Sequence, residues 1–118
     1  MALLHIPFES ISERHIDELI KGQVAESRDV EYKRETYGNS DADYAEFLAD
    51  VSSFANTSGG DLLLGVAATK GVPIALHPLQ IDPDTEIRRL EDMARTGIQP
   101  RIANLQVRAI PLKKGGWA

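Results

Sequence analysis

The segment FANTSGGDLLLGV, residues 54–66, constrains the fold most because it joins a helical pattern to a strand pattern through two glycines. Upstream of it, apolar residues recur at helical spacing over 41–55, at Tyr44, Phe47, Leu48, Val51, Phe54 and Ala55. Downstream, DLLLGVA is a nearly continuous apolar run, which is typical of one strand buried on both faces. The chain is therefore predicted to pack a helix against a sheet.

The glycine pair allows two interpretations, a phosphate cradle or a turn. In a phosphate-binding loop the glycines follow a strand and precede a helix, so that free N–H groups and the positive helix end face the anion. Here the order is reversed, and the negative helix end disfavours a phosphate by up to about 1 kcal/mol. We interpret the segment as a turn, with a small backbone nest for an anion as the alternative. Its residues are Asn56, Thr57, Ser58, Gly59 and Gly60.

The other elements follow from spacing and from capping residues. A short helix is expected between an N-cap at Ser12 and Gly22, and a helix over 41–55 is expected to begin at Ser40 or Asp41. A third helix should begin at Asp82-Pro83 and end at Gly97.

Strands are expected where apolar and polar residues alternate or cluster between turns. VEYKRE at 30–35 and ANLQVRAIPL at 103–112 alternate, and VPIAL at 72–76 follows a turn at Lys70-Gly71. Residues 113–116 are predicted to form a hairpin turn. The predicted fold class is α+β, with a small mixed β-sheet, two main helices packed on it and a short N-terminal helix.

Length and composition limit the class of protein. The 118 residues suit one domain spanning 1–118, and the hairpin turn near the end leads us to expect a further strand past Ala118, in a longer protein. No apolar run approaches the roughly 20 residues of a membrane span. The chain has no cysteine and no recognisable secretory signal, so we expect a cytoplasmic protein without a membrane partner.

Charge is distributed unevenly along the chain. The net charge of −5 argues mildly against extensive nucleic-acid binding, because phosphate contacts require lysine and arginine. However, residues 1–61 hold 13 acidic and 5 basic residues, whereas residues 62–118 hold 5 acidic and 8 basic ones. No acidic residue follows Asp92, while five basic residues do: Arg95, Arg101, Arg108, Lys113 and Lys114. This cluster is either a solvated face or a surface for a phosphate backbone.

The segment SSFANTSGGDLLLGV resembles the most recognisable block of the Schlafen-type AlbA-like domain. The upstream ESRDVEYK is similar to that family's second hallmark, a glutamate, four residues and then glutamate-aromatic-lysine, and GIQPRI resembles its isoleucine-proline boundary. The resemblance covers roughly residues 9 to 116. It implies an Alba-like fold and a DNA-binding role, commonly in bacterial proteins named transcriptional regulators or ATP-binding proteins. No Walker motif accompanies the ATP-binding label here.

In animal Schlafens the related domain can cut RNA, which requires clustered carboxylates around a divalent metal such as Mg²⁺ or Mn²⁺. Glu26, Glu31 and Lys33 match the family's glutamates and lysine, and strand alternation places Glu31 and Lys33 on one face. Nuclease-competent relatives have an aspartate after the glycine-valine pair, where this chain has Ala67 and Ala68. The competing interpretation of Glu31 and Lys33 is an exposed ion pair worth at most about 1 kcal/mol. The sequence therefore leans against an enzyme and against a cofactor.

We predict a nucleic-acid-binding domain, for DNA more than RNA, in a bacterial regulator-like protein. Its expected phosphate contacts are Lys33, Arg34, Arg101, Arg108, Lys113 and Lys114. A homodimer would suit this function, since pairing joins two modest basic faces. The alternatives are a Schlafen-type metal-dependent ribonuclease and a protein-interaction or dimerisation module.

Overall fold

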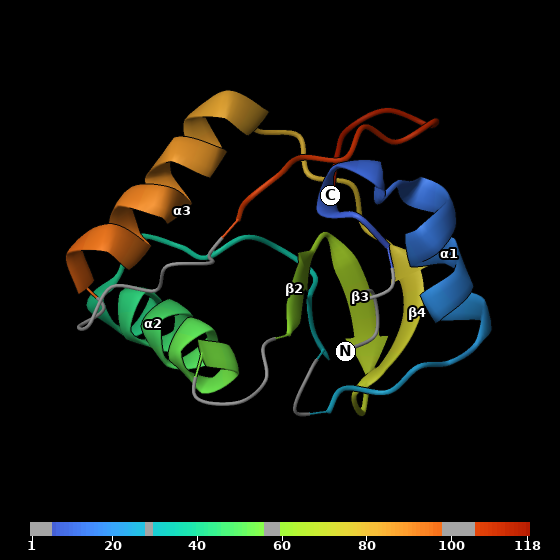
Figure 1. Cartoon of the computed structure of the whole chain (residues 1–118), viewed down its shortest axis with the longest axis horizontal. Helices are drawn as coiled ribbons and strands as arrows, with labels where there is room; N and C mark the ends of the chain where they lie inside the picture. The colour runs from blue at the N-terminus through green and yellow to red at the C-terminus, as the bar shows by residue number, and fades with distance from the viewer. Residues whose placement is uncertain (1–5, 28–29, 56–59, 98–105) are drawn as a thin grey trace.

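The computed structural model (Figure 1) describes residues 6–27, 30–55, 60–97 and 106–118. Its elements in chain order are a short 3-10 helix η1 (Phe8–Ser10), α1 (Glu13–Lys21), β1 (Val30–Lys33), α2 (Asp41–Ala55), β2 (Asp61–Leu64), β3 (Val66–Thr69), β4 (Val72–Leu76) and α3 (Pro83–Gly97). The α+β class is confirmed. In the described residues, however, the strands form two small sheets and not a single one, with β1 parallel to β2 and β3 antiparallel to β4.

The two long helices begin at the predicted caps. At the start of α2, the Ser40 hydroxyl accepts a hydrogen bond from the Asp43 N–H at 3.0 Å, and the Asp43 carboxylate accepts one from the Ser40 N–H at 3.3 Å. At the start of α3, the Asp82 carboxylate accepts a hydrogen bond from the Thr85 N–H at 2.9 Å, and Pro83 occupies the first helical position. The capping residues therefore predict the starts of α2 and α3 correctly.

The apolar run DLLLGVA forms two strands, so the prediction of one strand is wrong. Gly65 interrupts the run with a φ of +88°, a backbone conformation that side chains other than glycine's rarely adopt. Its N–H donates to the Lys33 carbonyl at 2.7 Å, and its carbonyl accepts from the His77 N–H at 2.7 Å. The left-handed backbone at Gly65 thus ends β2, which pairs with β1, and lets the chain continue as β3 in the second sheet.

The predicted strand over 103–112 is also wrong in its described part. Residues 106–110 belong to no strand, and the segment makes only an isolated bridge between Pro111 and Trp117. Its Ile110 exchanges two backbone hydrogen bonds with Ala118, at 2.9 and 3.0 Å. The hairpin turn over 113–116 is confirmed, because the Gly115 N–H donates to the Leu112 carbonyl at 3.0 Å. We call residues 110–118 the C-terminal hairpin.

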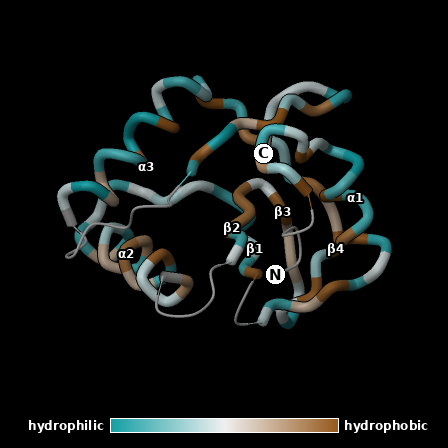
Figure 2. Tube along the Cα trace, viewed as in Figure 1, coloured by the Kyte–Doolittle hydropathy of each residue, from teal (hydrophilic) through white to brown (hydrophobic). Residues whose placement is uncertain are grey.

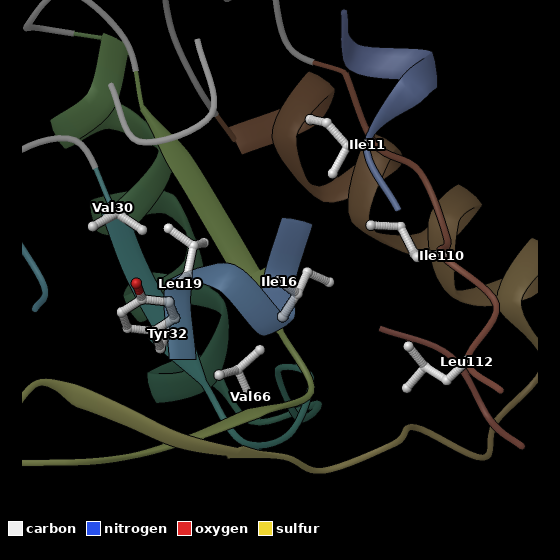
Figure 3. Packing of buried hydrophobic residues seen from close by; sticks show 8 residues of the cluster. All are labelled: Ile11, Ile16, Leu19, Val30, Tyr32, Val66, Ile110 and Leu112. Atoms are coloured by element: carbon white, nitrogen blue, oxygen red, sulfur yellow. The ribbon is translucent and has the colours of Figure 1, made fainter. Parts of the chain in front are cut away.

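Two apolar clusters hold the elements together. The first lies between α1, the strands and the C-terminal hairpin (Figure 3), and it contains Ile11, Ile16, Leu19, Val30, Tyr32, Val66, Ile110 and Leu112. The second joins α2 to α3 and contains Tyr37, Phe47, Val51, Leu90 and Ala94. In Figure 1 the strands lie between α1 on one side and α2 with α3 on the other. Figure 2 shows the hydrophobic strands in the middle of this arrangement.

Among the described helices, none combines the length and the apolarity that crossing a bilayer requires.

Candidate functional site

Strand β1 presents one buried and one accessible face. Val30 and Tyr32 are buried, whereas Glu31 and Lys33 are only partly buried, so the predicted alternation is confirmed. The Tyr32 hydroxyl donates to the Val24 carbonyl at 2.6 Å, which fixes the segment that precedes the strand. Glu31 and Lys33 therefore share the accessible face of a strand whose other face is anchored in the first apolar cluster.

Two carboxylates of α2 meet the Lys33 ammonium group. Glu46 forms an ion pair with it, and the Oδ2 atom of Asp50 lies 3.9 Å from Nζ. The Tyr37 ring centroid is 5.1 Å from the same nitrogen, and the Tyr37 hydroxyl donates to Asp50 at 2.6 Å. The positive charge of Lys33 is therefore balanced within the chain by acids one helical turn apart.

The charges around β1 also change the ionisation of its neighbours. Burial raises the pKa of Glu31, the negative charges of Glu26 and Asp50 raise it further, and Lys33 partly offsets the rise. Burial likewise raises the pKa of Tyr37, together with its hydrogen bond to Asp50. The Tyr37 hydroxyl thus keeps its proton and holds the Asp50 carboxylate in place. We call Glu26, Glu31, Glu46 and Asp50 the carboxylate cluster.

A buried ion pair holds the loop that carries Tyr37. Glu86 on α3 is 4% exposed, and the Arg89 guanidinium donates to both of its oxygens, at 2.8 and 2.7 Å. Thr36 donates to the same carboxylate, and Arg89 also donates to the Tyr37 and Gly38 carbonyls. The pair therefore ties loop 36–39 to α3 and places the Tyr37 ring against Phe47 and Lys33.

The side chains of the carboxylate cluster are of the type that holds divalent metal ions in proteins. Within the described parts of the chain, no group of three or more histidine, aspartate or glutamate side chains could hold a metal ion. The positions after the glycine-valine pair lie on β3 and carry Ala67 and Ala68, so they supply no ligand. Two of the cluster's carboxylates, Glu46 and Asp50, instead meet the Lys33 ammonium group.

Three of the predicted phosphate-binding residues are exposed: Arg34, Lys113 and Lys114. Arg34, just after β1, is exposed and its Nε lies 3.4 Å from Nδ1 of His77. Lys113 and Lys114 are exposed in the turn of the C-terminal hairpin. The backbone N–H of Lys113 donates to the Glu13 carboxylate at 2.7 Å, which fixes the turn relative to the start of α1 while the lysine side chain faces solvent.

A side-chain contact and backbone hydrogen bonds connect Arg34 to this hairpin through residues 77–79. The segment after β4 contains His77, the neighbour of Arg34, and Leu79, which exchanges two backbone hydrogen bonds with Trp117 at 2.7 and 3.0 Å. A methyl group placed on Gly116 would lie 2.7 Å from the side chain of Pro78, so the hairpin packs closely on this segment. Residues 77–79 therefore lie between Arg34 and the hairpin that carries the two lysines.

The other predicted cations are engaged or outside the described residues. Lys33 is paired with α2, as above. The Nη1 atom of Arg108 donates to the carbonyls of Phe8 at 3.0 Å and Ile11 at 2.6 Å, so this guanidinium fastens the N-terminal segment. Arg101 lies outside the described residues.

The glycine-rich turn is described only at its last residue, and Asn56, Thr57, Ser58 and Gly59 lie outside the described residues. A Cβ on Gly60 would overlap the ring of Phe54. A larger residue at position 60 would therefore require the Phe54 ring to shift. The choice between a turn and an anion nest over 56–60 stays a prediction.

Sequence reasoning missed the partners of the predicted residues. Glu46 and Asp50 stand four residues apart on α2, so their shared face is readable from the sequence, but their meeting with Lys33 depends on tertiary packing. Tyr37, Glu86 and Arg89 come from a loop and a distant helix, and no local pattern marks them as partners.

Comparison with known proteins identifies a family. The family described as Schlafen, AlbA_2 matches residues 26–116, which include the carboxylate cluster and most of the C-terminal hairpin. No curated protein and no solved structure compared with the chain matches it.

Proposed function

The chain belongs to the Schlafen AlbA_2 family, and from this premise we propose that it is a nucleic-acid-binding domain that contacts the phosphate backbone of DNA. The observation that carries the proposal is the exposed pair Lys113 and Lys114 in the turn of the C-terminal hairpin. Gly115, beside them, has open space where a side chain would lie, so the turn projects from the body of the domain.

Arg34 is the third proposed contact, because it is exposed and its neighbour His77 begins the segment on which the hairpin packs. Lys33 and Arg108 contribute less in this proposal, since each already has partners within the chain. Binding of this kind depends on charge, so it reads little of the base sequence and weakens as salt rises.

A titration of a labelled DNA duplex, followed by fluorescence anisotropy, tests the proposal. For three phosphate contacts, affinity should fall about 40-fold between roughly 50 and 200 mM salt. The double variant Lys113→Ala/Lys114→Ala should bind more weakly and lower the slope of log affinity against log salt by about 2. Arg88→Ala, which removes an exposed cation from α3, is the matched control and should keep the wild-type slope.

Failure to bind at low salt, or equal loss in the double variant and the Arg88 control, would contradict the proposal. The preference for DNA rests on the family's common role and is tested by repeating the titration with RNA of the same sequence. We place the domain in a cytoplasmic, bacterial regulator-like protein and propose a homodimer, which sedimentation at micromolar concentration would reject by detecting monomer only.

The ribonuclease alternative remains a separate prediction built on Glu26, Glu31 and Lys33. The described residues offer no group that could hold Mg²⁺ or Mn²⁺. Cleavage of labelled RNA in the presence of either ion, abolished by Glu31→Gln, would nevertheless establish it.

A further inference from the structure

We infer that the nucleic acid this domain recognises is double-stranded, and that single strands of the same sequence bind much more weakly. The inference rests on the proposed function and adds to it the form of the nucleic acid. It depends on where the aromatic side chains lie, because sequence-tolerant binding of single strands relies on bases stacking on accessible aromatic rings.

All seven aromatic residues of the chain lie in described segments. Four are buried: Tyr32 at 4% exposure, Tyr37 at 5%, Phe47 at 3% and Trp117 at 8%. Their positions are further fixed from within, since the Trp117 indole N–H donates to the Ile81 carbonyl at 2.7 Å and Tyr37 packs edge to face on Phe47. None of these four rings can receive a base without local unfolding.

The remaining three rings are partly buried, and each is held against the protein. Phe8 packs on the first apolar cluster. The Tyr44 hydroxyl lies 3.3 Å from the Met93 carbonyl and 3.2 Å from the Thr96 hydroxyl, which holds the ring between α2 and α3. Phe54 lies against the backbone of Gly60. The chain therefore presents no fully exposed aromatic face on which successive bases could stack.

What the surface does present is charge on a projecting turn. Lys113, Lys114 and Arg34 are exposed, and two of the three are adjacent in a hairpin with open space around its tip. Such cations gain most from a ligand with dense, regularly spaced phosphates, and a duplex carries one negative charge per about 1.7 Å of its axis. A single strand offers less charge per length, and here it would lack stacking, which is worth about 5- to 150-fold in affinity per base.

The test compares one labelled DNA strand of mixed sequence, about 20 nucleotides long, with the duplex that it forms with its complement. We expect the wild-type chain at about 50 mM salt to bind the duplex at least about tenfold more tightly. Equal or tighter binding of the single strand would overturn the inference and leave the proposed function standing. Absence of binding to either form would instead reject the proposed function, so the two failures are distinguishable.

A variant gives an independent readout of stacking. Phe54→Leu removes the ring nearest the family's glycine turn while keeping an apolar side chain, and it should leave the residual affinity for the single strand unchanged. A loss of about fivefold or more, in a variant whose circular dichroism and melting match the wild type, would show that bases stack there and would contradict the inference.

Discussion

Replacing Arg89 by methionine should destabilise the fold strongly, because it separates a buried ion pair. The substitution keeps an unbranched side chain of similar reach but removes the two donors to Glu86 and the donors to the carbonyls of Tyr37 and Gly38. The Glu86 side chain, which is 5% exposed, would keep Thr36 as its remaining side-chain donor among the contacts described.

The size of the effect follows from burial. Leaving one partner of a buried pair without the other costs about 3–5 kcal/mol, and the Arg89 side chain is 27% exposed, so water replaces part of what is lost. We expect the free energy of unfolding to fall by about 2–4 kcal/mol. For a chain of 118 residues this lowers the melting temperature by roughly 10 °C.

Urea and thermal unfolding, followed by circular dichroism, measure this change. Arg88→Met is the matched control, because it makes the same substitution on the preceding, exposed residue of α3 and should change stability by no more than about 0.5 kcal/mol. If the two variants were equally stable to within about 1 kcal/mol, the assigned role of the Glu86–Arg89 pair would be refuted.

The same pair predicts how stability varies with pH. Burial alone would raise the pKa of Glu86, but the hydrogen bonds from Arg89 and Thr36, with the charge of Arg89, outweigh it and lower the pKa in the folded state. The stability that ionised Glu86 contributes to the wild type is therefore fully present above the pKa of a glutamate in the unfolded chain, about 4.3. It is lost as pH falls through the lower pKa that Glu86 has in the folded state. In Arg89→Met, burial favours the protonated form of Glu86. The difference in free energy of unfolding between wild type and this variant, measured by urea titration, should therefore shrink as pH falls from 7 towards 4.

Three further outcomes follow from the contacts described. Gly65→Ala should lower the free energy of unfolding by about 2–4 kcal/mol, because a Cβ at a φ of +88° would also lie 3.1 Å from the His77 carbonyl. Gly115→Ala has a similar φ of +98° but open space around the Cβ, so it should cost only about 1–2 kcal/mol. Equal costs for the two variants would argue against a role for the His77 contact. Tyr37→Phe should lower stability by about 1–2 kcal/mol through loss of the bond to Asp50, whereas no change in a urea titration would mean that the bond contributes nothing. Burial, with the charges of Glu26 and Asp61, raises the pKa of Tyr32 to about 12. Titration of the folded protein to pH 10.5, followed by tyrosinate absorbance at 295 nm, should therefore give the same rise in wild type and in Tyr32→Phe. A smaller rise in the variant would show that Tyr32 ionises earlier than its raised pKa allows. Because that pKa is raised, the stability contributed by Tyr32 is complete below pH 10 and is lost as pH rises through about 12.

Local chemistry explains which parts of the fold the sequence predicts. Caps at Ser40 and Asp82, the turn at Lys70-Gly71 and the alternation along β1 each depend on a few neighbouring residues, and the structure agrees with all of them. The break at Gly65 was missed because hydropathy does not report backbone conformation, and an apolar run looks the same whether or not its strand is interrupted.

Candidate site residues were less predictable than elements, because charge partners come from different parts of the chain. Alternation correctly placed Glu31 and Lys33 on one face of β1. No spacing could show that Lys33 would meet Glu46, or that Arg108 would turn to the backbone of Ile11, since both contacts need the finished fold. The buried Glu86 was missed for the same reason, as a glutamate near a helix start is ordinarily solvated.

The bond from Arg108 to the carbonyl of Phe8 joins residues 100 positions apart in the chain. During synthesis, residues 8–11 leave the ribosome about 100 residues before Arg108, so at about 5–20 residues per second their bonds to Arg108 form roughly 5–20 s later. Helix α2 and the local β3–β4 pair can form meanwhile, because their contacts are close in sequence. Segment 8–11 is thus translated before α1 and every later described helix and strand, yet its bonds to Arg108 can form only after α3 has been synthesised.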